Sequence, residues 1–119
     1  MIKQIPSKEV VSYVKENPKS ILLDVRTEEE WKNIGKPNSN GLGIKTFFIT
    51  ISQDTNFIES VKKDINKEYQ ILVMCAAGGR SIIAANLLQK EGYITLNISD
   101  GFSGGGQGQG WKGEGLPIE

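Results

Sequence analysis

Apolar residues along this 119-residue chain fall into short runs that alternate with longer stretches in which they recur at helical spacing. Runs rich in Ile, Val, Leu and Phe predict β-strands. These runs cover residues 2–5, 21–25, 46–51, 71–74 and 94–98. The run at 21–25 is almost continuously apolar, which is typical of a parallel strand covered on both faces of its sheet.

Helices are expected between these runs. The first helix is capped by Ser7 and ends near Asn17-Pro18, and the second is acidic, covers 28–31 and is capped by Thr27. The third helix begins at Thr55 or Asn56. The fourth covers 81–91 and is closed by Gly92 in the left-handed conformation. Residues 33–45 are rich in Gly, Pro, Asn and Ser and are interpreted as a long loop. The alternation predicts an α/β fold with a mainly parallel sheet and helices on both faces.

The composition is ordinary for a soluble globular protein, with 38% hydrophobic and 24% charged residues, and we expect one domain over residues 1–119. The formal net charge of zero argues against a nucleic-acid partner, because no excess of Lys and Arg is available for phosphates. No segment approaches the ~20 apolar residues of a membrane span, and no apolar leader opens the chain, so neither a membrane partner nor secretion is expected. A single cysteine fits a reducing cytoplasm, the expected location.

Cys75 is that single cysteine, and it follows an apolar run and opens the segment Cys75-Ala76-Ala77-Gly78-Gly79-Arg80-Ser81. This pattern predicts a strand, a tight loop and the start of a helix. Backbone N–H groups and the positive end of the helix then point at the sulfur and favour its thiolate form, which is the nucleophile. The alternative is a small buried core residue, which free cysteines often are.

The chain contains no histidine, which excludes Cys-His and Ser-His-Asp hydrolases as well as zinc sites that use histidine. One cysteine also excludes a four-cysteine site. We therefore expect no metal and no cofactor. Activation of the thiol has to come from backbone dipoles, converging N–H groups and Arg80.

Of the fourteen Lys and Arg residues only two are arginine, Arg26 and Arg80, and each follows a predicted strand. This indicates positions that need a planar cation with several donors, although two chance surface arginines are the alternative. Ligands of parallel α/β folds bind beyond the carboxyl ends of the strands. We therefore expect Asp24-Val25-Arg26 and the loop from Cys75 to Ser81 to share one site.

A glycine-rich stretch, residues 101–115, holds eight of the fourteen glycines. Such a stretch can be a flexible tail. Trp111 and the closing Leu116-Pro117-Ile118 instead predict that it packs back onto the domain, because a large indole is costly to leave in water.

Several motifs occur together in a specific order. They are Asp24-Val25-Arg26, Glu30-Trp31, Cys75-x-x-Gly78-x-Arg80-Ser81, Asp100-Gly101-Phe102, Trp111 and Gly115-Leu116-Pro117. In this order the chain resembles a single-domain rhodanese-like protein over nearly its whole length. The resemblance implies a three-layer fold with a central, mainly parallel five-stranded sheet. It also implies a sulfurtransferase that carries a sulfane sulfur as a cysteine persulfide and passes it to a thiophilic acceptor.

The resemblance also assigns expected roles. Cys75 matches the persulfide-bearing nucleophile, and the loop that cradles the sulfur matches Ala76, Ala77, Gly78, Gly79, Arg80 and Ser81. Asp24, Arg26 and Glu30 match the motif that supports the site, with Asp24 expected to accept N–H groups of a neighbouring loop and Arg26 expected to pair with Glu30. Trp111 and Leu116-Pro117 match the C-terminal closure of the family.

The chain departs from the family after Glu30-Trp31 and before the next predicted strand, where residues 35–41 replace a stretch that often contains histidine. Dual-specificity phosphatases of the same fold have Cys-x5-Arg, whereas here four residues separate Cys75 from Arg80, and the shorter loop favours a single sulfur over a phosphoryl group. The same fold also serves as a non-catalytic binding module and as an arsenate reductase, and the sequence leaves both functions open.

The expected partners are a small sulfur donor or a persulfide-bearing protein, and a thiol acceptor, with the chain acting as a monomer. Arg80 is expected to orient an anionic donor and the loop. Because Ala76 and Ala77 add no charge, we expect weak use of thiosulfate. Their small side chains are expected to leave Cys75 approachable by another protein's cysteine, with residues 101–110 adapting around the partner.

Overall fold

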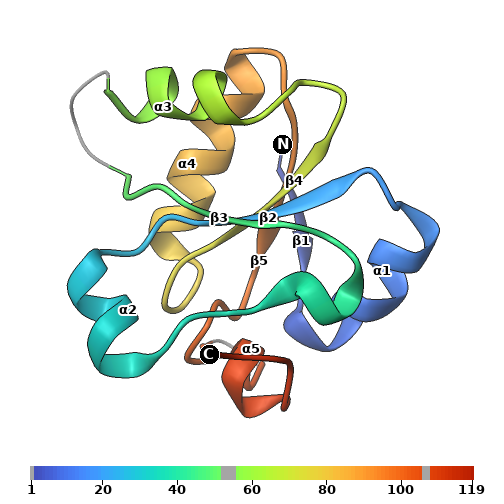
Figure 1. Cartoon of the computed structure of the whole chain (residues 1–119), viewed down its shortest axis with the longest axis vertical. Helices are drawn as coiled ribbons and strands as arrows, with labels where there is room; N and C mark the ends of the chain where they lie inside the picture. The colour runs from blue at the N-terminus through green and yellow to red at the C-terminus, as the bar shows by residue number, and fades with distance from the viewer. Residues whose placement is uncertain (1, 52–55, 106–107) are drawn as a thin grey trace.

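A sheet of five parallel strands lies at the centre of the computed structural model, which describes residues 2–51, 56–105 and 108–119. The strand order is β1-β5-β4-β2-β3. The strands are β1 (Lys3–Ile5), β2 (Ser20–Asp24), β3 (Thr46–Phe48), β4 (Gln70–Met74) and β5 (Ile94–Ile98). The predicted α/β fold with a parallel five-stranded sheet is therefore confirmed (Figure 1).

Helices cover both faces of this sheet (Figure 1). They are α1 (Val10–Glu16), α2 (Glu28–Ile34), α3 (Asn56–Asp64), α4 (Gly79–Lys90) and α5 (Gly110–Gly113), with the 3-10 turns η1 (Ser7–Glu9) and η2 (Ser39–Leu42). Buried side chains of α3 and α4 pack with one set of strand residues, and those of α1 and the C-terminal segment pack with the other set. The result is a three-layer arrangement with a core on each side of the sheet.

The pairing of β2 with β4 decides where the candidate site lies. Asp24 is opposite Met74, and the N–H of Val25 donates to the carbonyl of Met74 at 2.9 Å. Both strands are parallel, so the chain leaves them at the same edge of the sheet. The loop that begins at Cys75 therefore starts beside Arg26, as the sequence predicts.

Several predicted boundaries differ in detail. Ser7 does not cap a helix, because its hydroxyl donates to Asp100 at 2.8 Å and the chain first makes the 3-10 turn η1. The capping box of Thr27 with Glu30 is present, and α2 continues to Ile34. The third strand ends at Phe48 instead of continuing to residue 51, and the loop at 33–45 contains η2. Thr55, one predicted start of the third helix, lies outside the described residues.

The C-terminal segment folds back onto the domain, as predicted from its aromatic and apolar residues. Trp111 is fully buried, and its indole N–H donates to the carbonyl of Pro117 at 2.7 Å. An isolated antiparallel bridge joins Pro37 to Ile118. The end of the chain thereby covers the loop that follows α2.

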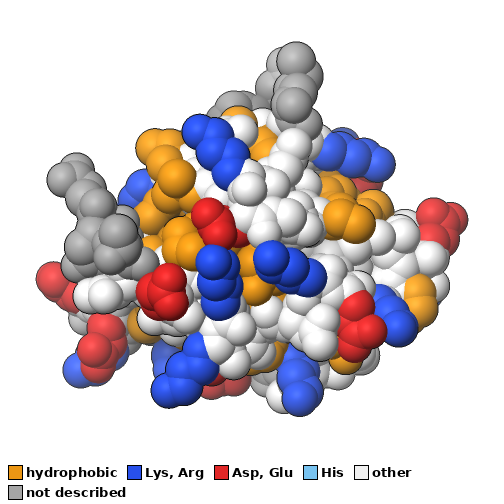
Figure 2. Space-filling view, turned by 90° about the horizontal axis from the view of Figure 1, so that it is seen from above, with side chains coloured by type: hydrophobic (Ala, Val, Ile, Leu, Met, Phe, Trp, Pro, Cys, Tyr) orange, Lys and Arg blue, Asp and Glu red, His pale blue; other side chains and the backbone are white. Residues whose placement is uncertain are grey.

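The surface carries charges of both signs. Figure 2 shows Lys, Arg, Asp and Glu side chains mixed over one face, with hydrophobic side chains between them. This mixture agrees with the zero net charge of the chain and gives that face no extended field of one sign. Within the described residues, no helix combines the length and the apolar content required to cross a membrane.

Candidate active site

Cys75 lies immediately after β4 and is only 1% exposed. The N–H of Gly78 donates to its Sγ at 3.1 Å, and the hydroxyl of Ser81 lies 3.3 Å from the same sulfur. Burial raises the pKa of the Cys75 thiol, but hydrogen bonds from Ser81, Gly78 and Ala77 outweigh it and lower the pKa below its ordinary value of 9.0. The loop therefore favours the thiolate, as the sequence pattern predicts.

Gly78 is needed at its position for two reasons. Its backbone has a φ of +102°, in the left-handed region that strains other residues. A Cβ atom there would lie 2.4 Å from the carbonyl oxygen of Ser99, which is closer than two such atoms can approach. A glycine thus allows the chain to turn tightly enough for its N–H to point at the Cys75 sulfur.

The glycine-rich segment after β5 holds the outer side of this loop. The N–H of Phe102 donates to the carbonyl of Cys75 at 2.8 Å, and the N–H of Ser103 donates to that of Ala76 at 2.9 Å. A Cβ atom on Gly101 would lie 2.5 Å from both of these carbonyl oxygens. The carbonyls of the cysteine loop therefore face the glycine-rich segment, whereas the N–H of Gly78 in the same loop faces the Cys75 sulfur.

This packing overturns one expectation. The small side chains of Ala76 and Ala77 were expected to leave Cys75 approachable, whereas its 1% exposure shows that the thiol is covered. Ala77 itself is exposed, but Gly105 lies against it. The small side chains of the loop instead allow neighbouring backbone to pack against it.

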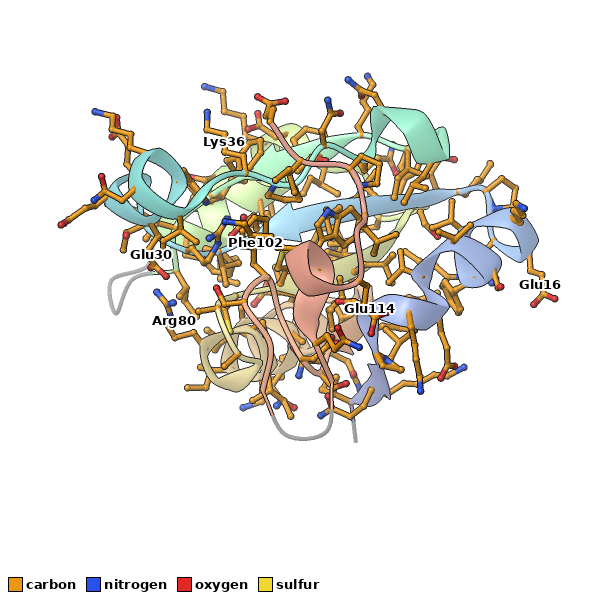
Figure 3. All side chains as sticks on the ribbon, turned by 90° about the horizontal axis from the view of Figure 1, so that it is seen from below. Glu16, Glu30, Lys36, Arg80, Phe102 and Glu114 are labelled. Atoms are coloured by element: carbon orange, nitrogen blue, oxygen red, sulfur yellow. The ribbon has the colours of Figure 1, made fainter. Side chains whose placement is uncertain are left out.

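Arg80, at the C-terminal end of the cysteine loop, makes a two-point ion pair with Glu30 of α2; we call this place the mouth of the loop. The two terminal nitrogens of Arg80 lie 2.7 and 2.8 Å from the two carboxylate oxygens. Figure 3 shows the two side chains facing each other, one from α2 and one from the start of α4. The hydrogen bonds from Arg80 lower the pKa of Glu30 to about 2, against the effect of partial burial, with a further contribution from Thr27. In the same pair, Glu30 raises the pKa of Arg80.

The predicted pairing of Arg26 with Glu30 is therefore wrong. The guanidinium of Arg26 instead binds Asp24, with Nε 3.1 Å from each carboxylate oxygen and one terminal nitrogen 2.9 Å from Oδ2. Both side chains are completely buried. A buried charge requires a nearby group of opposite charge, and Asp24 is only two residues away from Arg26 in the same turn.

The Asp24–Arg26 pair ties neighbouring segments together. Asp24 also accepts the N–H of Arg26 at 3.0 Å, so its backbone contact lies within its own turn and not in a neighbouring loop as predicted. Arg26 donates to the carbonyl of Gly35 at 2.8 Å, and its guanidinium lies 4.1 Å from the centre of the Phe102 ring. The pair thus joins the end of β2 to the loop after α2 and to the glycine-rich segment.

Asn97 is a site residue that the sequence reasoning missed. It lies in β5, is 2% exposed, and its side chain contacts the hydroxyl of Ser81 and the carbonyl of Gly78. The available signal was an amide residue between Leu96 and Ile98 in a strand whose only other polar residue is Thr95. A buried amide of this kind needs hydrogen-bond partners, and here it finds them in the cysteine loop.

The structure brings together all the residues predicted for the loop, and it places Glu30 at the loop through Arg80. Asp24 and Arg26 lie behind the loop as a buried pair. Within residues 2–51, 56–105 and 108–119, no cluster of three or more His, Cys, Asp or Glu side chains is arranged to hold a metal ion.

The sequence and the fold are similar to those of several known proteins. Residues 7–106 match the family model of the rhodanese-like domain. The chain is 40% identical to the uncharacterized protein RP600 of Rickettsia prowazekii, over 87% of this chain and 85% of that protein. It is 30% identical to the chloroplastic thiosulfate sulfurtransferase 16 of Arabidopsis thaliana, over 82% of this chain and 78% of that protein. The crystal structure of Rv0390 from M. tuberculosis matches with a TM-score of 0.86 and 28% identity, over 98% of this chain and 96% of that chain.

Proposed function

Because this chain belongs to the rhodanese-like family, we propose that it is a sulfurtransferase that carries a sulfane sulfur as a persulfide on Cys75 and passes it to a thiol acceptor. The observation that carries this proposal is the hydrogen bonding of the Cys75 sulfur by the N–H of Gly78 and the hydroxyl of Ser81 at the end of a central strand. The similarity to a protein named a thiosulfate sulfurtransferase supports this reaction class.

Sulfur transfer balances without an added oxidant or reductant. The Cys75 thiolate attacks the sulfane sulfur of a donor R–S–SH, the donor S–S bond breaks, and its electron pair leaves as R–S⁻. The proton remains on the transferred sulfur, so Cys75 becomes Cys–S–SH. An acceptor thiolate R′–S⁻ then attacks the outer sulfur, forming R′–S–SH and returning the Cys75 thiolate. The N–H of Gly78 stabilises the negative charge on Sγ at both ends of this cycle.

The Arg80–Glu30 pair supports a persulfide donor over thiosulfate. Both terminal nitrogens of Arg80 are already bound to the carboxylate, so its charge is neutralised at the mouth of the loop. Thiosulfate carries two negative charges and gains little from such a pair. A persulfide requires only a thiolate to attack its sulfur and donors to stabilise the anion.

The same pair argues against a phosphatase. A phosphoryl group requires a free two-point arginine as well as a wide ring of N–H groups. Arg80 instead binds Glu30, and the loop has four residues between Cys75 and this arginine. No observation specifically favours arsenate reduction or a purely non-catalytic docking role.

Mass spectrometry tests the proposed reaction. The protein is incubated separately with thiosulfate and with a low-molecular-weight persulfide, and the peptide that contains Cys75 is analysed. We expect this peptide to gain the mass of one sulfur, in a larger fraction of the protein with the persulfide than with thiosulfate. The Cys75→Ser variant should gain no sulfur. A higher kcat/KM with thiosulfate than with the persulfide, measured with one acceptor, would overturn the donor assignment; no sulfur gain with either would overturn the function.

A further inference from the structure

The hydroxyl of Ser81 lies between two groups that both accept hydrogen bonds. One is the Cys75 sulfur at 3.3 Å, and the other is the side-chain oxygen of Asn97. All three residues are buried, with exposed fractions of 0%, 1% and 2% for Ser81, Cys75 and Asn97. A hydroxyl has a single proton to donate. The sulfur and the amide oxygen therefore compete for it.

The orientation of the Asn97 amide follows from its other contacts. Its nitrogen donates to the carbonyl of Gly78 at 3.2 Å and to the side-chain oxygen of Gln4 at 2.8 Å. A backbone carbonyl can only accept, so the nitrogen of the amide has to face Gly78. The amide oxygen then faces Ser81 and cannot itself supply a proton.

We infer that Asn97 is a positioning residue that makes the Ser81 hydroxyl a two-position proton donor for Cys75. In the thiol form, Ser81 donates to Asn97, and the thiol S–H donates to the Ser81 oxygen. When the thiol loses its proton to solvent, the Ser81 O–H turns to the thiolate and leaves the amide oxygen of Asn97. This inference rests on the proposed function, which it deepens by naming a residue that sets when the nucleophile is charged.

The two positions match the two states of the sulfur-transfer cycle. In the persulfide state Sγ carries no charge, and Ser81 is free to donate to Asn97. As the acceptor thiolate breaks the S–S bond, negative charge returns to Sγ, and the Ser81 proton turns toward it. The hydroxyl thereby stabilises the leaving sulfur, and no proton is gained or lost by the site in this step. The competing amide prevents the hydroxyl from holding the thiolate too firmly.

The direction of the effect provides the test. Because Asn97 competes for the Ser81 proton, Asn97→Ala should leave the Ser81 hydroxyl free to donate to the Cys75 sulfur. The Cys75 pKa should then fall by about 0.5 to 1 unit, which corresponds to the free energy of one neutral hydrogen bond. Ser81→Ala should raise this pKa. In the Ser81→Ala background, Asn97→Ala should leave the pKa unchanged, since no hydroxyl remains to be released. Asn86→Ala, which removes an exposed asparagine on α4, serves as the matched control.

The measurement is the rate of Cys75 alkylation by iodoacetamide as a function of pH, followed by mass spectrometry, with circular dichroism as the check on folding. Two results would overturn the inference: an equal shift of the Cys75 pKa by Asn97→Ala in the wild-type and Ser81→Ala backgrounds, or a rise of this pKa. Either result would mean that Asn97 acts only by binding the carbonyl of Gly78. If Asn97→Ala does not fold, Asn97→Val offers a residue suited to a central strand and lacks the acceptor. No sulfur donor is used, so a failure of sulfur loading would contradict the proposed function and leave this result standing.

Discussion

Glu30→Gln tests how much the ion pair between Glu30 and Arg80 contributes to the stability of the folded protein. Glutamine keeps the capping box with Thr27, because either side chain can accept the N–H at the start of α2. It removes the negative charge that faces Arg80. The substitution therefore isolates the ion pair from the helix cap.

The size of the effect follows from the Glu30 pKa. Lowering this pKa from 4.5 to about 2 corresponds to about 3 kcal/mol of favourable interaction in the folded protein. The Arg80 side chain is 40% exposed, and solvent screens such pairs, so we expect about 1–2 kcal/mol. For a chain of this length, the melting temperature should fall by about 3–6 °C for each kcal/mol.

The pH dependence has a definite sign. The folded pKa of Glu30 lies below its unfolded value, so its stabilisation is fully present above about pH 4.5 and is lost as the pH falls toward 2. The difference in unfolding free energy between wild type and Glu30→Gln, measured in urea, should shrink by about half or more between about pH 7 and about pH 3. An equal difference at both pH values, or an equal loss in the control Glu29→Gln, would refute the assignment.

The same variant reports on donor choice. With Glu30 neutral, the Arg80 guanidinium is free to attract an anion. We expect kcat/KM for thiosulfate to rise by about 3- to 10-fold, and that for a neutral persulfide donor to change much less. Unchanged thiosulfate use would show that the carboxylate does not limit this donor.

Three further substitutions give separate outcomes. Arg80→Lys keeps the charge but not the two-point contact with Glu30, and steady-state assays should show a fall in kcat/KM of up to about tenfold; equal activity would mean that charge alone matters. Asp24→Ala leaves Arg26 buried without its carboxylate, so thermal unfolding should show a loss of about 3–5 kcal/mol together with lower activity, whereas full stability without activity would make Asp24 a direct participant. Gly78→Ala should raise the Cys75 pKa in alkylation assays, since a Cβ atom displaces the loop N–H; an unchanged pKa would contradict this role.

The sequence predicts the fold well because its signals are local. The five apolar runs become five strands, Thr27 forms its capping box, and Gly92 takes a φ of +100° at the end of α4. The strand predicted at 46–51 ends at Phe48 in the structure. Ile49 and Ile51 still donate backbone hydrogen bonds to the carbonyls of Asp24 and Val25, and their side chains pack on the core, so the apolar pattern continues beyond the strand itself.

Parts of the site are predicted less well because they depend on contacts between distant residues. Cys75 and its loop form a contiguous motif, and the sequence identifies them. The partners of the two arginines do not follow from spacing: Glu30 lies four residues after Arg26 and fifty before Arg80, yet it binds Arg80. Asn97 lies sixteen residues after Ser81 in a different strand, and the pairing of β4 with β5 places it beside the cysteine loop.

Neither of the two arginines supplies an unpaired positive charge to the cysteine loop. Arg26 is neutralised by Asp24 inside the fold, and Arg80 is neutralised by Glu30 at the mouth of the loop. The Cys75 pKa is nevertheless lowered, and the groups that lower it are the hydroxyl of Ser81 and backbone N–H groups. Fixed dipoles stabilise a single charge on one sulfur but add little long-range attraction. A site built in this way suits the small, singly charged sulfur of a thiolate or persulfide better than a dianion drawn from solution.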